Sequence, residues 1–102
     1  MKNKKQYLKK YIIQEKRIKR LNEMIILNPK KEADYLNEIN DCEILKQEIE
    51  NKISRINDDL LREVLFLKYT CDKTLLEVAE IIGYSHRHTE RLHKAALEKF
   101  EP

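Results

Sequence analysis

Six polar side chains near the C-terminus have the types and spacing that could recognise a nucleic acid. They are Ser85, His86, Arg87, Glu90, Arg91 and Lys94. Arginine can donate two hydrogen bonds to the edge of a guanine base, whereas lysine contacts phosphate mainly as a point charge. We therefore expect Arg87 and Arg91 to read bases, with His86 and Glu90 as further candidates. Ser85 and Lys94 are better suited to phosphate, since a helix N-terminus attracts anions.

Two predicted helices joined by a sharp turn would position these residues. The first begins at Thr74, where Glu77 has the spacing of a capping box, and it ends before Gly83, the only glycine in the chain. The second begins at Ser85, a good N-cap, and continues to Phe100. Its inward face is predicted to hold Thr89, Leu92, Ala96 and Phe100. This pattern predicts a helix-turn-helix, and the alternative is a helical hairpin that never touches DNA.

Three further helices are predicted before this pair. Apolar residues at helical and heptad spacing indicate one helix over about 4–27 and another from about 31–34 to 56, separated by Asn28-Pro29. The short connection favours an antiparallel, coiled-coil-like hairpin. Asn57 to Asp59 are typical N-cap residues and predict a third helix through about Tyr69. The all-α chain is thus expected to divide into a hairpin for dimerisation or interaction (1–56) and a DNA-binding domain (57–102).

Charge is distributed unevenly along the chain. Residues 1–20 contain nine Lys and Arg against one Glu, a net charge of +8, whereas residues 21–56 carry −3 and residues 57–102 carry −2. Clustered positive charge is compatible with phosphate binding, so Lys9, Lys10 and Lys73 are candidate phosphate contacts. A solvated charged helix with no ligand explains residues 1–20 equally well.

Several classes of protein are excluded or disfavoured. No glycine-rich phosphate loop, zincin motif or nucleophile paired with a base is present, so we expect no enzyme and no cofactor. His86, Glu90 and His93 share a helical spacing but lack a further ligand, so we expect no metal site. The histidines are instead expected to lie on the helix surface or to face DNA. No apolar run is long enough to cross a membrane. Cys42 and Cys71 are isolated and predict reduced thiols in a cytoplasmic protein.

Residues 57–102, which include the stretch beginning LLREVLFLKYT, resemble region four of bacterial sigma factors, a small helical domain that reads the −35 promoter element. The stretch YSHRHTERLHKAALEKF is similar to phage-encoded regulators of this type, the RinA/ArpU-type late-gene activators. At Thr89 the sequence departs from the usual branched aliphatic residue, so a looser contact with the preceding helix is expected. The resemblance implies transcription regulation in a bacterial host cell, contact with promoter DNA, and contact with RNA polymerase.

Two functions from different classes follow. The favoured one is a sequence-specific regulator of transcription, phage or prophage encoded, that binds double-stranded DNA as a homodimer on a two-part site. The alternative is a helical adaptor that binds RNA polymerase or another protein without reading DNA sequence.

Overall fold

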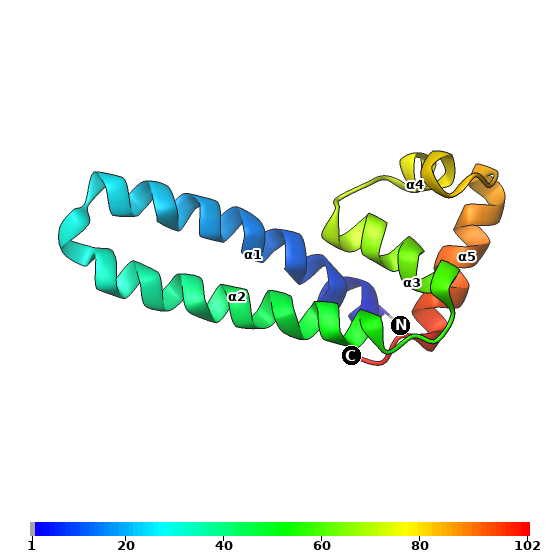
Figure 1. Cartoon of the computed structure of the whole chain (residues 1–102), viewed down its shortest axis with the longest axis horizontal. Helices are drawn as coiled ribbons and strands as arrows, with labels where there is room; N and C mark the ends of the chain where they lie inside the picture. The colour runs from blue at the N-terminus through cyan, green and yellow to red at the C-terminus, as the bar shows by residue number, and fades with distance from the viewer. Residues whose placement is uncertain (1) are drawn as a thin grey trace.

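The computed structural model describes residues 2–102, with the backbone alone for Lys2, and it is all-α. Two long helices, α1 (Lys2–Leu27) and α2 (Glu32–Ser54), pack as an antiparallel pair (Figure 1). Three shorter helices follow and pack together: α3 (Asp59–Leu65), α4 (Leu75–Ile82) and α5 (His86–Lys99). The 3₁₀ turn η1 (Pro29–Lys31) joins the long helices, and the π-helical turn η2 (Phe66–Thr70) extends α3. None of the helices described over 2–102 is long and apolar enough to span a bilayer.

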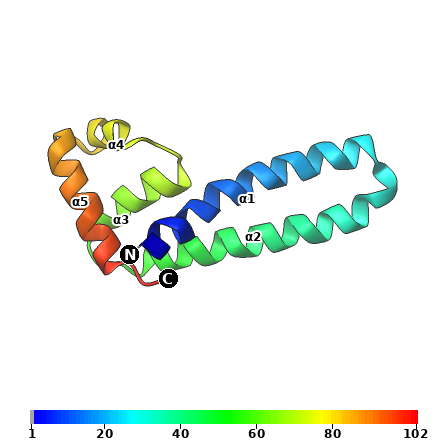
Figure 2. The same cartoon turned by 180° about the vertical axis from the view of Figure 1, so that it is seen from behind.

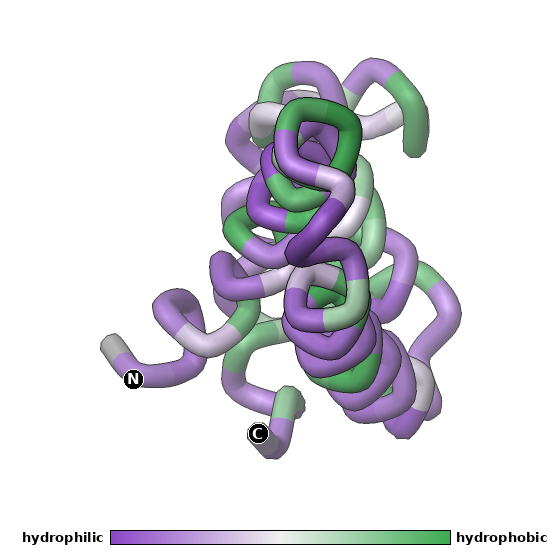
Figure 3. The backbone as a smooth tube through the Cα atoms, turned by 90° about the vertical axis from the view of Figure 1, so that its left-hand side faces the viewer, coloured by the Kyte–Doolittle hydropathy of each residue, from purple (hydrophilic) through white to green (hydrophobic). Residues whose placement is uncertain are grey.

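The predicted hairpin of residues 1–56 is confirmed as an antiparallel helix pair. Tyr11 and Leu21 of α1 and Cys42 and Ile49 of α2 are buried. Seen from the side of the hairpin turn, hydrophobic and hydrophilic residues alternate along the tube, as expected for helices with one packed face (Figure 3).

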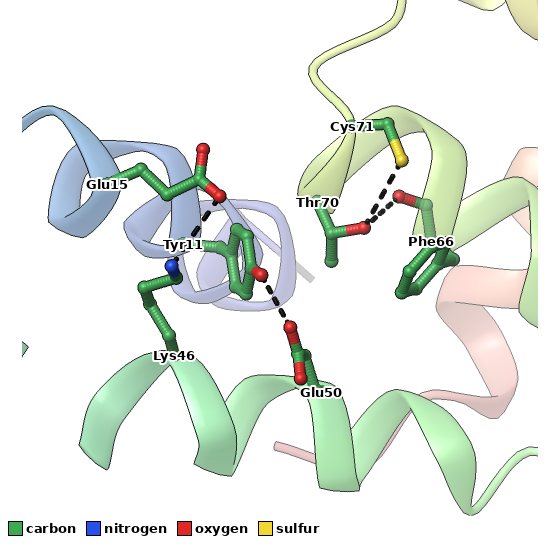
Figure 4. A network of polar contacts seen from close by, with 7 residues as sticks. All are labelled: Tyr11, Glu15, Lys46, Glu50, Phe66, Thr70 and Cys71. Atoms are coloured by element: carbon green, nitrogen blue, oxygen red, sulfur yellow. Dashed lines mark hydrogen bonds and ion pairs between the residues drawn. The ribbon is translucent and has the colours of Figure 1, made fainter. Parts of the chain in front are cut away.

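Polar contacts cross the hairpin at several levels. The Tyr11 hydroxyl donates to the carboxylate of Glu50, and Lys46 pairs with Glu15 at 3.6 Å (Figure 4). Arg17 pairs with Glu38 nearer the turn. The basic α1 and the acidic α2 are thus matched in charge, although exposed pairs of this kind contribute only about 0.2–1 kcal/mol each.

One hydrophobic core joins the base of the hairpin to the C-terminal helices. Leu8, Ile49 and Phe100 have no exposed surface and lie in the same cluster. The cluster is completed by Tyr11, Ile53, Ile56, Leu61, Leu65, Tyr69 and Ala96. Because it draws on α1, α2, α3, η2 and α5, this core fixes the hairpin relative to the three short helices. The first turns of α1 and the C-terminal end of the chain lie at this junction (Figures 1 and 2).

Local sequence signals begin and end the short helices as expected. Asp58 caps α3 by accepting from the backbone N–H of Leu61 at 3.0 Å. Thr74 and Glu77 form the predicted capping box of α4, with both reciprocal hydrogen bonds present. Gly83 ends α4 at φ +79°, in the left-handed region, and its N–H donates to Ala79.

Replacing Gly83 tests the turn between α4 and α5. A Cβ added there would meet no atom within 4 Å, so the cost of Gly83→Ala is conformational. We expect it to lower the free energy of unfolding by about 1 kcal/mol in urea titrations. Asn tolerates this backbone region better than Ala, so Gly83→Asn should cost less. An equal cost for both variants would contradict the backbone explanation.

Candidate nucleic-acid interface

The inner face of α5 is anchored against α3 and α4. Thr89, Ala96 and the following Phe100 have no exposed surface. The Thr89 hydroxyl donates to the carbonyl of Ser85 at 2.8 Å, so its polar atom is satisfied inside the core. The looser contact expected at Thr89 is therefore not observed. Leu92 is half-buried, and it also packs against the main core.

Both ends of α5 are held by side-chain hydrogen bonds. At its start, the Ser85 hydroxyl accepts from the backbone N–H of His88 at 3.1 Å, which is the predicted N-cap. At its end, the Lys4 ammonium of α1 donates to the carbonyls of Leu97, at 2.8 Å, and Glu98, at 3.3 Å. A cation at a helix C-terminus is favourable because the terminal carbonyls carry partial negative charge. α1 thus stabilises the helix that bears the candidate site.

The outer face of α5 carries the six predicted site residues. All of Ser85, His86, Arg87, Glu90, Arg91 and Lys94 are exposed. Among the residues described, none of their charged groups forms an ion pair, so the two arginines and Lys94 are open to an external partner. Tyr84, which sequence reasoning left out, lies beside them with its ring 4.9 Å from that of His88.

His93 does not belong to this exposed face. The sequence interpretation treated the histidines as surface or DNA-facing groups, but His93 is buried and its Nε2 lies 2.7 Å from the Tyr69 hydroxyl. Burial, together with the nearby positive charges of Lys68 and Lys5, lowers the pKa of His93 to about 4. Burial also raises the pKa of Tyr69 to about 12. This neutral pair joins η2 to α5.

Tyr69, which contacts His93, lies within the π-helical turn η2. The backbone N–H of Cys71 donates to the carbonyl of Phe66, five residues earlier, and the Thr70 hydroxyl donates to the same carbonyl (Figure 4). The wider turn changes the direction of the side chains that follow it. Helical periodicity in the sequence does not reveal such a turn.

Two adjoining depressions between α1 and the C-terminal helices form a surface that we name the basic groove. One lies between α1, η2 and the loop before α4, and the other between α1, η2 and α5; both include Lys9, Lys68 and Tyr69. The groove is defined by Lys5, Lys9, Lys16, Lys68, Lys73 and Lys94. Only Asp72 and Glu90 contribute acidic side chains to its lining.

Two of the three candidate phosphate contacts line the basic groove, and the third does not. Lys9 and Lys73 line it together with Lys94 of α5, although they are far apart in the sequence. Lys10 does not line it, and its ammonium lies 5.6 Å from the centre of the Tyr7 ring. Sequence reasoning missed Lys5 and Lys16, whose spacing from Lys9 places all three on one side of α1.

Comparison with protein-family models, curated proteins and solved structures finds no match to this chain. Within residues 2–102, no group of three or more His, Cys, Asp or Glu side chains is arranged to hold a metal ion. What the site can do therefore has to be argued from its own residues.

The buried His93 predicts a loss of stability in mild acid. The unfolded chain binds a proton near the usual histidine pKa of 6.5, whereas the folded chain resists it until about pH 4. The free energy of unfolding should therefore fall as the pH drops below 6.5, by on the order of 2 kcal/mol at pH 5.

Urea titrations at pH 7 and pH 5 measure this effect. His93→Gln keeps a polar partner for Tyr69 but cannot titrate, so much of the difference between the two pH values should disappear. His86→Gln, at an exposed position of the same helix, is the matched control and should retain the difference. If His93→Gln showed the same pH dependence as the unaltered chain, the buried histidine would not be its source.

Proposed function

We propose that this protein binds double-stranded DNA in a sequence-specific manner, with α4 and α5 as a helix-turn-helix. The observation that carries the proposal is the outer face of α5. It presents two arginines and a lysine that form no ion pair with the residues that the structure describes, on a helix whose inner face and both ends are fixed. A rigid helix with such a face suits the major groove, where base edges are distinguishable.

The residues of α5 take different parts in this proposal. Arg87 and Arg91 lie one helical turn apart and donate to base edges, with His86 and Glu90 as neighbouring polar contacts. Lys94 continues the same face toward the basic groove, where phosphate is the better partner. Ser85 lies at the start of the helix, where backbone N–H groups favour an anion.

The resemblance of residues 57–102 to sigma region four and to RinA/ArpU-type activators supports a role in transcription. Under this proposal the protein is a phage or prophage regulator acting in the cytoplasm of a bacterial host. The packing of three short helices after a long charged hairpin is compatible with that layout.

A second candidate function is that of an adaptor for RNA polymerase or another protein. It is supported by an apolar depression between α3, η2 and α4, which we name the apolar groove. It is lined by Leu60, Glu63, Phe66, Leu67, Ile81 and Ile82. Phe66 and Ile81 are exposed, so a partner helix could bury them.

Selection of bound sequences from random duplexes separates the two functions. A DNA reader enriches a motif, whereas an adaptor enriches none even at low salt. On the selected duplex, Arg87→Ala should weaken binding by about 1–3 kcal/mol and relax the preference at one base position. Arg55→Ala removes an exposed arginine at the end of α2 and serves as the control. Unchanged affinity and preference in Arg87→Ala would show that α5 is not the reading helix.

We further propose that the protein forms a homodimer through the turn of the hairpin. Ile26 and Leu27 are 78% and 83% exposed there, and Leu36 adds to the same end of the hairpin. Dimeric readers place two such helices on paired half-sites.

Sedimentation measures the dimer directly. The unaltered chain should sediment as a dimer, and Ile26→Glu with Leu27→Glu should shift it to a monomer, because charge in an apolar interface is unfavourable. Ile44→Glu, at another exposed position of α2, is the control. A monomeric unaltered chain at micromolar concentration would refute this part of the proposal.

A further inference from the structure

The basic groove is a concentration of positive charge that the protein does not neutralise. Lys46, Lys52, Arg17 and Arg62 all have carboxylate partners within 4 Å, but they lie outside the groove. In the part of the chain that the structure describes, none of the six groove lysines forms such a pair. Six like charges around two carboxylates are therefore left to solvent or to an external anion.

The effect of this charge extends beneath the surface of the groove. Two of its lysines, Lys68 and Lys5, contribute to the lowered pKa of the buried His93. The Lys68 ammonium also lies 5.6 Å from the centre of the Tyr69 ring. The positive potential is thus concentrated where α1, η2 and α5 meet. Such a surface favours an extended anion over a neutral or cationic ligand.

The shape of the groove fits a strand of phosphates. Lys5, Lys9 and Lys16 lie on the side of α1 that faces η2 and α5, away from the seam with α2. From Lys5 to Lys16 the helix rises about 16 Å. A straight row of this length can contact more than one phosphate of a DNA strand.

The groove is continuous with the outer face of α5. Glu90 and Lys94 line its second depression together with Lys5 and Lys9. Figure 2 shows α5 and the first turns of α1 at the same end of the molecule, where Lys4 bonds to the end of α5. A duplex seated on α5 would therefore bring its backbone toward α1.

We infer that the basic groove is a second DNA-binding surface, in which α1 holds the phosphates that flank the bases read by α5. The inference rests on the proposed function, which it deepens. It makes the hairpin part of the DNA interface and assigns to Lys5, Lys9 and Lys16 of α1 a role shared with Lys68 and Lys73. Binding here is independent of sequence, because the phosphate backbone carries no base identity.

The salt dependence of binding tests this inference. The affinity of the full chain for its selected duplex is measured over a range of salt concentrations for two double variants. Lys9→Gln with Lys16→Gln removes two groove charges, and Lys19→Gln with Arg55→Gln removes two exposed charges that lie outside the groove and outside the hairpin turn. A plot of log affinity against log salt has a negative slope, and the groove variant should make this slope less negative by about 1.8. Its selected motif should not change.

The control variant should keep the slope of the unaltered chain. An unchanged slope in the groove variant, or an equal decrease in both variants, would overturn the inference. Failure of the proposed function looks different, because the unaltered chain would then enrich no motif at all. Urea titrations of both variants establish that the fold is kept, and since all four residues are exposed we expect little change in stability.

Discussion

The core beneath Phe100 is the constraint on which the other features depend. Phe100 follows α5, has no exposed surface, and lies in one cluster with Leu8 of α1 and Ile49 of α2. Its ring centre is 6.0 Å from that of Tyr7. This burial attaches the base of the hairpin to the end of the helix that carries the candidate site. Without it, α1 and α5 would have no fixed relation, and the basic groove between them would not exist.

The packing of α1 beside α5 compensates for the uneven distribution of charge along the sequence. The C-terminal residues 57–102 carry −2 and residues 1–20 carry +8, so the helix proposed to read DNA lies in an acidic part of the sequence. Folding places the basic α1 beside α5, and Lys9 and Lys94 come to line one depression. Selectivity and electrostatic attraction can thus come from two segments that are remote in sequence. The two-part composition of the chain has a physical reason in this account.

Local features were predictable from the sequence, and features that depend on distant packing were not. The caps at Thr74 and Ser85 and the turn at Gly83 follow from residue type, because each satisfies backbone groups within a few positions. His93 is buried in contact with Tyr69, which is remote in sequence and lies in a π-helical turn that periodicity does not reveal. The groove likewise requires the docking of α1, so nothing local distinguished Lys9 from Lys10.

Lysine labelling with and without the selected duplex tests the central claim most directly. Each lysine is modified in solution, and its protection by DNA is read by mass spectrometry. The account predicts that Lys9, Lys68, Lys73 and Lys94 are protected together, while Lys19, which is exposed outside the groove, stays reactive. Protection of Lys94 with full labelling of Lys9 and Lys68, or equal protection of all lysines, would contradict a single surface formed by α1 and α5.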